Sequence, residues 1–295
     1  MLRTSSPLRR IVMRRALEME ARVGLALRSV GIELRRSSFY LPLPDAAHLP
    51  ETLWSGPRPT PGLELRLDDG LRLTGAIGGY LTEFPTTFQV ANGSYEYGDA
   101  HTLWAMLRHL KPRHLIELGS GASSHLISAA KAANEADGSP LQFTTYDPFP
   151  GWHSMGAVPG SVVHPIAAER LDPQVVDTLE SGDVLFVDTT HTVKTGGDVA
   201  HIFLELLPRL KSGVYVHIHD IFLPYEYPRR WVKDLRFAWA EQYLLQAFLA
   251  FNEQFEVVLP VHALWRDRHD QLVQVIPDLA QIEGEGPGAF WIRRR

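Results

Sequence analysis

The chain contains no cysteine, which excludes disulfide bonds, thiolate metal ligands and a cysteine nucleophile. Lysine is also scarce, with five lysines among 29 basic residues, and acidic residues outnumber basic ones to give a net charge of −5. This balance disfavours nucleic acid as a partner, because duplex binding needs an excess of positive charge. No segment approaches the roughly 20 consecutive apolar residues of a membrane span. Small molecules are therefore the expected partners.

The length of 295 residues, with 45% hydrophobic and 21% charged residues, is enough to bury a full core. We expect an N-terminal helix and a cap or lid region over residues 1–96, and one larger domain over residues 97–295. Residues 39–85 are rich in proline and turn residues without a clear helical period, which predicts an irregular segment with short strands such as residues 63–67.

The first sixteen residues carry five arginines. No apolar core of signal-peptide length follows them, so a cytoplasmic protein is expected. These residues could form a solvated helix that packs on the domain, or a basic amphipathic helix that touches a membrane surface. The sequence leaves open whether the chain forms a homo-oligomer.

The most informative segment is residues 114–125, HLIELGSGASSH, in which an apolar strand leads into a glycine turn and then a helix. Its first five residues predict a buried parallel strand, and Gly119 and Gly121 allow a tight turn that a ligand can approach closely. Ser123 or Ser124 is expected to cap the helix. This arrangement is typical of a nucleotide-type cofactor site.

Two acidic residues narrow the choice of cofactor. Asp147 ends a second predicted strand, where its carboxylate can accept hydrogen bonds from both hydroxyls of a ribose. Glu117 would repel a pyrophosphate beside the turn but could orient an ammonium group. A dinucleotide fingerprint also needs a third glycine, where this chain has Ser124. S-adenosylmethionine, which carries an ammonium and a sulfonium, is therefore favoured over NAD.

From residue 97 onward, short apolar segments alternate with helical ones. They predict strands at residues 114–118, 141–147, 161–166, 183–188, 213–219, 255–261 and 288–293. This alternation predicts an α/β, Rossmann-like fold with a mostly parallel sheet covered on both faces. A polar loop with no credible helix separates the last two strands, so they are expected to form an antiparallel hairpin at the sheet edge. A helix over residues 99–110 is expected to end near Pro112.

Seven strands with a terminal hairpin resemble the class I S-adenosylmethionine-dependent methyltransferase fold, over residues 97–295. The resemblance implies that residues 117–121, ELGSG, form the glycine-rich cofactor motif and that Asp147 is the ribose-binding acid. The residues expected at the cofactor are Glu117, Gly119, Ser120, Gly121, Ser123, Asp147 and Asp188.

Polar side chains follow two further predicted strands, at the point where each strand ends. Asp188-Thr189-Thr190-His191 follows one strand, and His219-Asp220 follows the next. The carboxyl ends of parallel strands lie beside the ligand crevice, so Asp188, His219 and Asp220 could converge there. Their oxygens suit magnesium or manganese, and the imidazole admits a softer ion. The alternative is that Asp188 caps a turn and His191 is a packed loop histidine.

The block of residues 183–228 closely resembles a methyltransferase subfamily related to metal-dependent sugar O-methyltransferases of macrolide biosynthesis. The resemblance implies that Asp188, His219 and Asp220 bind a divalent metal and that His191 is the general base. His219 stands where those sugar enzymes use a glutamate. A histidine is also suited to the base role on chemical grounds, because its pKa lies near neutrality.

The expected function is O-methylation of a small hydroxylated acceptor, a glycosyl unit or a natural product. Tyr225, Tyr227 and Trp231 could stack on that acceptor or pack against the next helix, and residues 95–99, YEYGD, could form a lid over the cofactor. An NAD-binding oxidoreductase, a metal-dependent hydrolase or oxygenase, and a catalytically silent binding protein stay open as alternatives, because a fold does not fix a function.

Overall fold

The computed structural model describes residues 23, 27, 43–150 and 158–295. The chain divides into two compact units, residues 1–45 and residues 46–295. Val23 and Leu27 are helical, whereas the arginine-rich first sixteen residues lie outside the described residues. Within the described part of the chain, no helix has the length and apolarity that a bilayer crossing requires. The sheet and the candidate site belong to the second unit.

Seven strands form one sheet in the order β3-β2-β1-β4-β5-β7-β6. Their bounds are β1 (His114–Leu118), β2 (Gln142–Tyr146), β3 (Ser161–His164), β4 (Val184–Val187), β5 (Tyr215–Ile218), β6 (Phe255–Pro260) and β7 (Phe290–Arg294). The first five strands are parallel, and β7 runs antiparallel to both β5 and β6. The predicted fold class, and a strand in each of the seven predicted segments, are confirmed.

The connection between the last two strands differs from the prediction. The expected loop contains α8 (Val261–Asp267), α9 (His269–Val275) and the 3-10 helix η7 (Pro277–Gln281). Leu264 and Leu272 of these helices are fully buried in the core. The predicted polar loop is wrong because these helices are short and are stabilised by tertiary packing rather than by a long apolar period. Strand β7 then inserts between β5 and β6, which leaves β6 at the edge.

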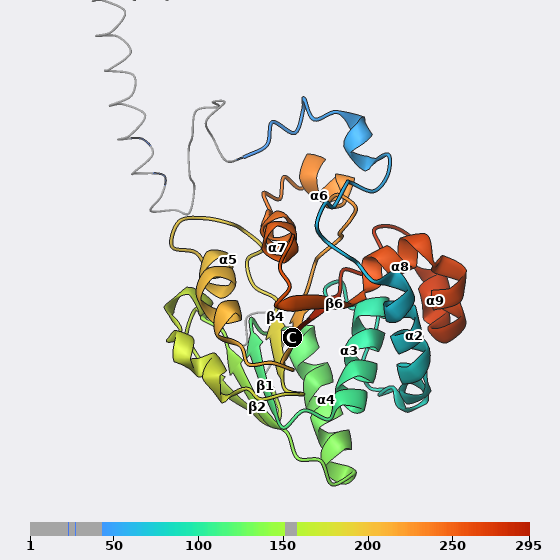
Figure 1. Cartoon of the computed structure of the whole chain (residues 1–295), viewed down its shortest axis with the longest axis vertical. Coiled ribbons are helices and arrows are strands. Elements are labelled where there is room, and N and C mark those ends of the chain that lie inside the picture. The colour runs from blue at the N-terminus through green and yellow to red at the C-terminus, as the bar shows by residue number, and fades with distance from the viewer. Residues whose placement is uncertain (1–22, 24–26, 28–42, 151–157) are drawn as a thin grey trace, which may run out of the picture. The chain divides into compact units, whose positions relative to one another are not determined.

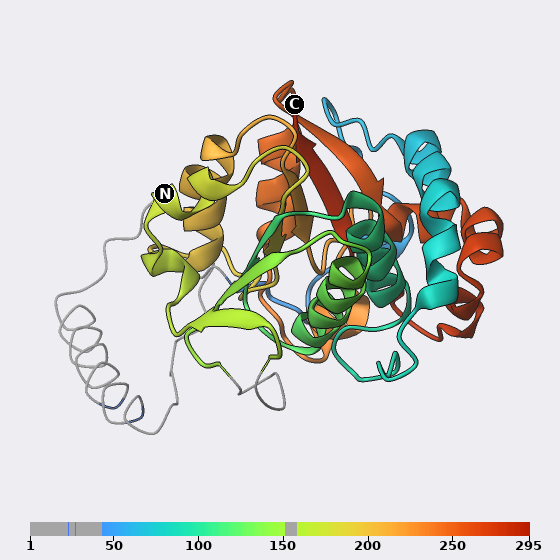
Figure 2. The same ribbon diagram turned by 90° about the horizontal axis from the view of Figure 1, so that it is seen from below.

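Helical segments cover both faces of the sheet (Figures 1 and 2). One face packs against α2 (Leu67–Ile77), α3 (Tyr97–Leu110) and α4 (Ala122–Ala136), and the other packs against α5 (Asp198–His201) and α7 (Glu241–Leu249). The shorter segments are η1 (Glu51–Trp54), η2 (Gly78–Glu83), η3 (Ala168–Arg170), η4 (Pro173–Thr178), the π-helical η5 (Ile202–Leu206), η6 (Leu207–Arg209) and α6 (Arg229–Lys233). Successive strand residues face opposite cores, as the two-residue period of a strand requires.

The segment before the sheet is more regular than predicted. Helix α2 occupies part of the stretch expected to be irregular, and residues 63–66 form no strand, so both expectations are wrong. Helix α2 is amphipathic: it buries Ile77, and Leu67, Leu71 and Leu73 pack against the same core, a helical pattern that the flanking proline-rich stretches obscure in the sequence. Residues 46–96 belong to the same compact unit as the sheet, and a functional division at residue 97 stays a proposal.

The sheet register places the predicted functional segments side by side. Leu118 pairs with Val187, and Val187 pairs with Ile218. The residues that follow these three positions therefore leave the sheet at the same edge. This edge carries the glycine turn after β1, Asp188 after β4 and His219 after β5.

Candidate active site

The glycine turn after β1 is packed directly against the end of β4. Gly119 has a φ of +86°, and a Cβ atom on it would lie 1.8 Å from the carbonyl oxygen of Asp188. Its N–H donates to the carbonyl of Tyr146 at 2.9 Å. Only glycine adopts this conformation without strain and leaves room for that carbonyl. The group that approaches Gly119 closely in this structure is therefore the backbone carbonyl of Asp188.

Asp147 lies at the end of β2 and faces the same turn. Its Oδ2 accepts hydrogen bonds from the backbone N–H of Ser120 at 2.8 Å and from the Ser120 hydroxyl at 2.5 Å. Its Oδ1 accepts from the N–H of Phe149 at 2.6 Å. The predicted ribose-binding acid is therefore held beside the glycine turn, with Ser120 as its immediate neighbour.

Glu117 lies beneath the turn and is completely buried. Its oxygens accept hydrogen bonds from the hydroxyls of Ser123, Ser124 and Thr145 at 2.8–3.2 Å. Burial raises the pKa of Glu117 to about 8, although these hydroxyls oppose the rise. The N-cap of α4 is Gly121, with the Ser124 hydroxyl accepting its N–H at 3.1 Å, so the expectation that Ser123 or Ser124 occupies the cap is wrong. Both serines instead support Glu117.

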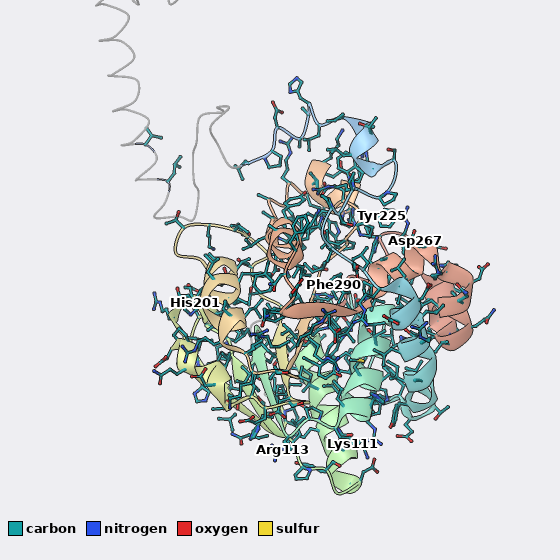
Figure 3. All side chains as sticks on the ribbon, viewed as in Figure 1. Lys111, Arg113, His201, Tyr225, Asp267 and Phe290 are labelled. Carbon is teal, nitrogen blue, oxygen red and sulfur yellow. The ribbon has the colours of Figure 1, made fainter. Side chains whose placement is uncertain are left out.

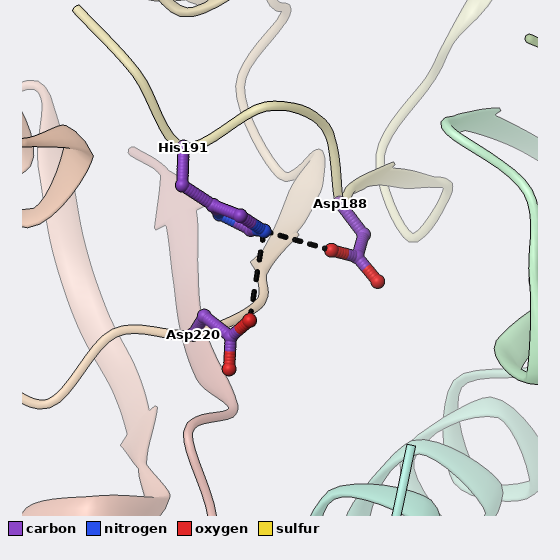
Figure 4. Close-up of side chains that lie close together, drawn as sticks. All are labelled: Asp188, His191 and Asp220. Atoms are coloured by element: carbon purple, nitrogen blue, oxygen red, sulfur yellow. Dashed lines mark ion pairs between the residues drawn. The ribbon is translucent and has the colours of Figure 1, made fainter. Parts of the chain in front are cut away.

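Asp188, His191 and Asp220 meet at the carboxyl edge of the sheet (Figure 4). The Nε2 atom of His191 lies 3.2 Å from Oδ1 of Asp188 and 3.5 Å from Oδ2 of Asp220. One ligand atom of each residue lies within 4.8 Å of the others, which is close enough for one cation. His191 and Asp220 both have a φ near +55°, a conformation uncommon outside glycine and often found at functional sites.

His219 approaches the same two carboxylates. Its Nδ1 atom lies 3.4 Å from Oδ2 of Asp188 and 3.6 Å from Oδ2 of Asp220. Its Nε2 atom lies 3.3 Å from Asp99, a buried residue of α3 that also accepts the N–H groups of Gly288 and Ala289. The three predicted metal-binding side chains therefore lie together, but the group whose ligand atoms all lie within 4.8 Å of one another contains His191 in place of His219.

Glu241 is a buried acid of this site that sequence reasoning missed. It is the first residue of α7, and its Oε2 lies 2.8 Å from Nδ1 of His191. The main chain joins the same two segments, since the His191 carbonyl accepts the N–H groups of Ala240 and Glu241. Nothing in the local sequence marks Glu241, because an acidic residue in the first turn of a helix is common for electrostatic reasons alone.

The carboxylates of the acidic cluster, which comprises Asp188, His191, His219 and Asp220, hold its two histidines in their protonated form. Burial disfavours the charged form of His191, but hydrogen bonds to Asp188 and Glu241 and the charge of Asp220 raise its pKa to about 10. Burial also disfavours the charged form of His219, but the carboxylates of Asp220 and Asp188 outweigh this effect and raise the pKa of His219. Burial raises the pKa of Asp220, whereas His219 and His191 hold the pKa of Asp188 well below its usual range against burial.

The predicted acceptor aromatics lie in different surroundings. Trp231 lines a cavity of about 170 Å³ together with Tyr97, His219 and Asp220. Tyr225 lines a separate hollow. Its hydroxyl donates a hydrogen bond to Asp267 at 2.5 Å, and Figure 3 labels Tyr225 and Asp267. Tyr227 is buried, and its hydroxyl accepts the N–H of Gln242. Only Trp231 of the three lines the cavity beside the acidic cluster, and contact of any of them with an acceptor stays a prediction.

The strand order and the glycine turn with its acidic partners are those of the class I S-adenosylmethionine-dependent methyltransferase fold. In agreement with this class, residues 116–221 match the family described as Methyltransferase domain. That match begins within β1, at Ile116, and ends at Ile221, so it includes the glycine turn, Asp147, Asp188, His191 and Asp220.

The chain is also similar to solved methyltransferase structures, at low sequence identity. The structure described as CmcI-N160 apo is 15% identical, with 66% of this chain and 70% of that chain covered and a TM-score of 0.40. The Podospora anserina methyltransferase PaMTH1, bound to SAH, is 16% identical, with 75% and 88% covered and a TM-score of 0.43. Similarity at this level carries no information on substrate. No curated protein matches the chain significantly.

Proposed function

We propose that the protein transfers a methyl group from S-adenosylmethionine to a hydroxyl of a small acceptor, a glycosyl unit or a natural product. The observation that supports this proposal most directly is the position of His191. Its Nε2 lies between Asp188 and Asp220, at the strand edge that also carries the glycine turn. A candidate general base thus lies beside the expected cofactor site and near the cavity that Trp231 lines.

The residues around the glycine turn fit the cofactor. Asp147 offers carboxylate oxygens for ribose hydroxyls, and Gly119, Ser120 and Gly121 form the turn that would hold the methionine portion. Glu117 and Ser123 support this turn from below. When bound, S-adenosylmethionine supplies an already activated methyl group. The protein then has to orient the acceptor and remove its hydroxyl proton.

We assign proton removal to Nε2 of His191. A positioned histidine is well suited to accept the hydroxyl proton as the new bond to carbon forms. Asp188 and Asp220 lie on either side of this nitrogen and would stabilise the imidazolium that results. Asp188 also adjoins Gly119, so the same residue connects the base with the cofactor turn.

The donor set at this edge fits a divalent metal. Asp188 and Asp220 supply carboxylates and His219 supplies an imidazole, a mixed set that suits manganese better than magnesium. Such an ion would lower the pKa of the acceptor hydroxyl. Asp99 stands behind His219, in the manner of a carboxylate that orients a metal-binding histidine.

A screen of hydroxylated acceptors with S-adenosylmethionine labelled in the methyl group tests the proposed function. Transfer of label to oxygen in the product would support it. Calorimetry with NAD and with S-adenosylmethionine distinguishes the proposed methyltransferase from the oxidoreductase alternative, because only the cofactor of the true reaction should bind tightly. Turnover of an acceptor without S-adenosylmethionine would support the hydrolase or oxygenase alternative instead.

Replacing Asp147 with alanine is expected to weaken S-adenosylmethionine binding by roughly tenfold to a hundredfold, since a charge-assisted hydrogen bond contributes about 1.5 to 3 kcal/mol. Calorimetry gives the Kd directly. Asp172→Ala is a matched control, because Asp172 accepts one backbone N–H in an exposed turn and lies outside the proposed cofactor site. Equal affinities in the two folded variants would remove Asp147 from the cofactor site.

Removing the metal is expected to shift the rise of kcat with pH to higher pH. His191 accepts a proton only when neutral, and its pKa of about 10 keeps it protonated at neutral pH in the metal-free protein. In EDTA, kcat should therefore rise as the pH rises toward 10. A divalent ion at Asp188 and Asp220 offsets the charges that hold this proton, so manganese should shift the rise to lower pH.

A direct measurement of manganese binding accompanies this profile. Electron paramagnetic resonance should show one bound ion per chain, and His219→Ala should weaken its affinity by at least about tenfold. His114→Ala serves as the control, because His114 contacts Asp183 at the opposite end of the strands. An identical pH profile in EDTA and in manganese, with no bound ion, would show that the site works without metal.

A further inference from the structure

The environment of Glu241 is costly for a residue with only a structural role. The side chain is completely buried, and Oε1 has no hydrogen-bond partner among the described residues. Burying a carboxylate is costly unless it is fully paired, and a buried polar atom without a partner adds to that cost. A neutral glutamine at this position could also bond His191 without the burial of a charge.

The loop that carries His191 does not need this carboxylate for its attachment to α7. The carbonyl of His191 accepts the N–H of Ala240 at 2.8 Å and the N–H of Glu241 at 3.2 Å. The ring of Trp239 lies 4.4 Å from the His191 ring, centre to centre, and limits its movement on one side. Main-chain bonds and packing thus place the loop, whereas the Glu241 carboxylate acts on the imidazole itself.

The direction of this contact decides which nitrogen of His191 faces the acceptor. Nδ1 lies 2.8 Å from Oε2 of Glu241, within the usual range for a charge-assisted hydrogen bond. A carboxylate can only accept there, so the proton of Nδ1 stays in place. Nε2 is left as the nitrogen that can lose and regain a proton, and it points between Asp188 and Asp220 (Figure 4).

We propose that Glu241 is the positioning residue of the methyl-transfer reaction: it holds the proton on Nδ1 of His191 and so presents Nε2 as the base. This inference rests on the proposed O-methyltransferase function and on the assignment of His191. An amide at residue 241 loses this control, because its NH₂ group can turn toward Nδ1 and force the proton onto Nε2.

The first test is kinetic. Glu241→Gln is expected to lower kcat by about tenfold to a thousandfold, which is no more than the loss of the base itself, with the KM for the acceptor and the Kd for S-adenosylmethionine within about twofold of wild type. In a double-mutant cycle, Glu241→Gln should cause no further loss in a His191→Ala background, because both act through one imidazole. Additive losses in this cycle would overturn the proposal.

The second test needs no acceptor and therefore separates failure of this inference from failure of the proposed function. In proton–nitrogen NMR spectra, the Nδ1–H of His191 should give a downfield ring resonance that is protected from water and is identified by its loss in His191→Ala. The Glu241→Gln variant should broaden this resonance or move it upfield. An unchanged resonance would overturn the proposal even if methyl transfer were demonstrated.

Asp183 offers a matched control. It is also a buried carboxylate beside a histidine, with Oδ2 3.2 Å from Nδ1 of His114, and it accepts the backbone N–H groups of Arg113 and His114 at 2.9 Å. It lies at the opposite end of the strands, the end that Arg113 marks in Figure 3. Asp183→Asn should lower Tm while kcat stays within about twofold of wild type, as expected for a structural carboxylate.

If Glu241→Gln does not fold, Glu241→Asp takes its place. Its carboxylate is drawn back from Nδ1 by one methylene, so the charge stays while the contact is lost. The expected fall in kcat and the change in the Nδ1–H resonance are the same. Wild-type values for both in a folded Glu241→Asp variant would count against the positioning role.

Discussion

Replacing His191 with alanine is expected to lower kcat by about 10² to 10⁴, the usual contribution of a positioned general base, and to leave the Kd for S-adenosylmethionine within about twofold of wild type. The reason is geometric. Nε2 lies between Asp188 and Asp220, whereas all the expected cofactor contacts except Asp188 come from β1, from the turn and helix that follow it, and from Asp147. Binding and chemistry should therefore separate in single-turnover and calorimetric measurements.

The control for this variant is His114→Ala, which removes a second acid-paired histidine at the other end of the sheet. Its kcat should match wild type. The pH profile adds a further check, because the dependence on His191 should disappear together with its side chain. A His191→Ala enzyme that methylates at the wild-type rate from pH 6 to pH 9 would show that the base is another group.

Among the substitutions proposed here, Gly119→Ala should cause the largest loss of thermal stability and of affinity for S-adenosylmethionine. The left-handed backbone costs about 1 to 3 kcal/mol for a residue with a side chain, and a methyl group 1.8 Å from the Asp188 carbonyl forces the two loops apart at a cost of about 1 to 3 kcal/mol more. We expect Tm to fall by more than about 5 °C, with S-adenosylmethionine binding too weak to measure by calorimetry.

Gly121→Ala is the matched comparison within the same turn. A Cβ atom on Gly121 meets no atom within 4 Å, and its φ of −174° is extended backbone that any residue adopts. Its Tm should stay within about 2 °C of wild type. Equal thermal stability of the two variants would contradict the packing of the glycine turn against β4 that the structure shows.

The sheet could be predicted from the sequence because its strands are short, apolar and bounded by turns. Strand β4 is buried at all four positions, which gives a continuous apolar run that needs no knowledge of its neighbours. Helices α8 and α9 gave no comparable pattern. Each spans two turns and depends on a contact such as that of Leu272 with the core, which exists only after the chain has folded.

The candidate site also combines residues that the strand pattern predicts with residues that only the folded chain brings near. Asp188, His219 and Asp220 could be predicted to converge because each directly follows a parallel strand, and the sheet register then places them together. The partners behind the histidines could not be predicted. Glu241 is 50 residues from His191, and Asp99 is 120 residues from His219. Both lie in the first turn of a helix, where an acidic residue has an ordinary local explanation.

The insertion of β7 between β5 and β6 bears on how the protein acquires its chemistry. The residues just before β7 hold Asp99 through the N–H groups of Gly288 and Ala289, and the backbone of Gly288 lies against Asp220, since a Cβ atom there would be 2.9 Å from the Asp220 Cα. These contacts join α3 to the segment that leads into β7. During translation, β1 to β5 can pair before β7 is available, whereas the support that Gly288 and Ala289 give to Asp99 forms only once β7 joins the sheet.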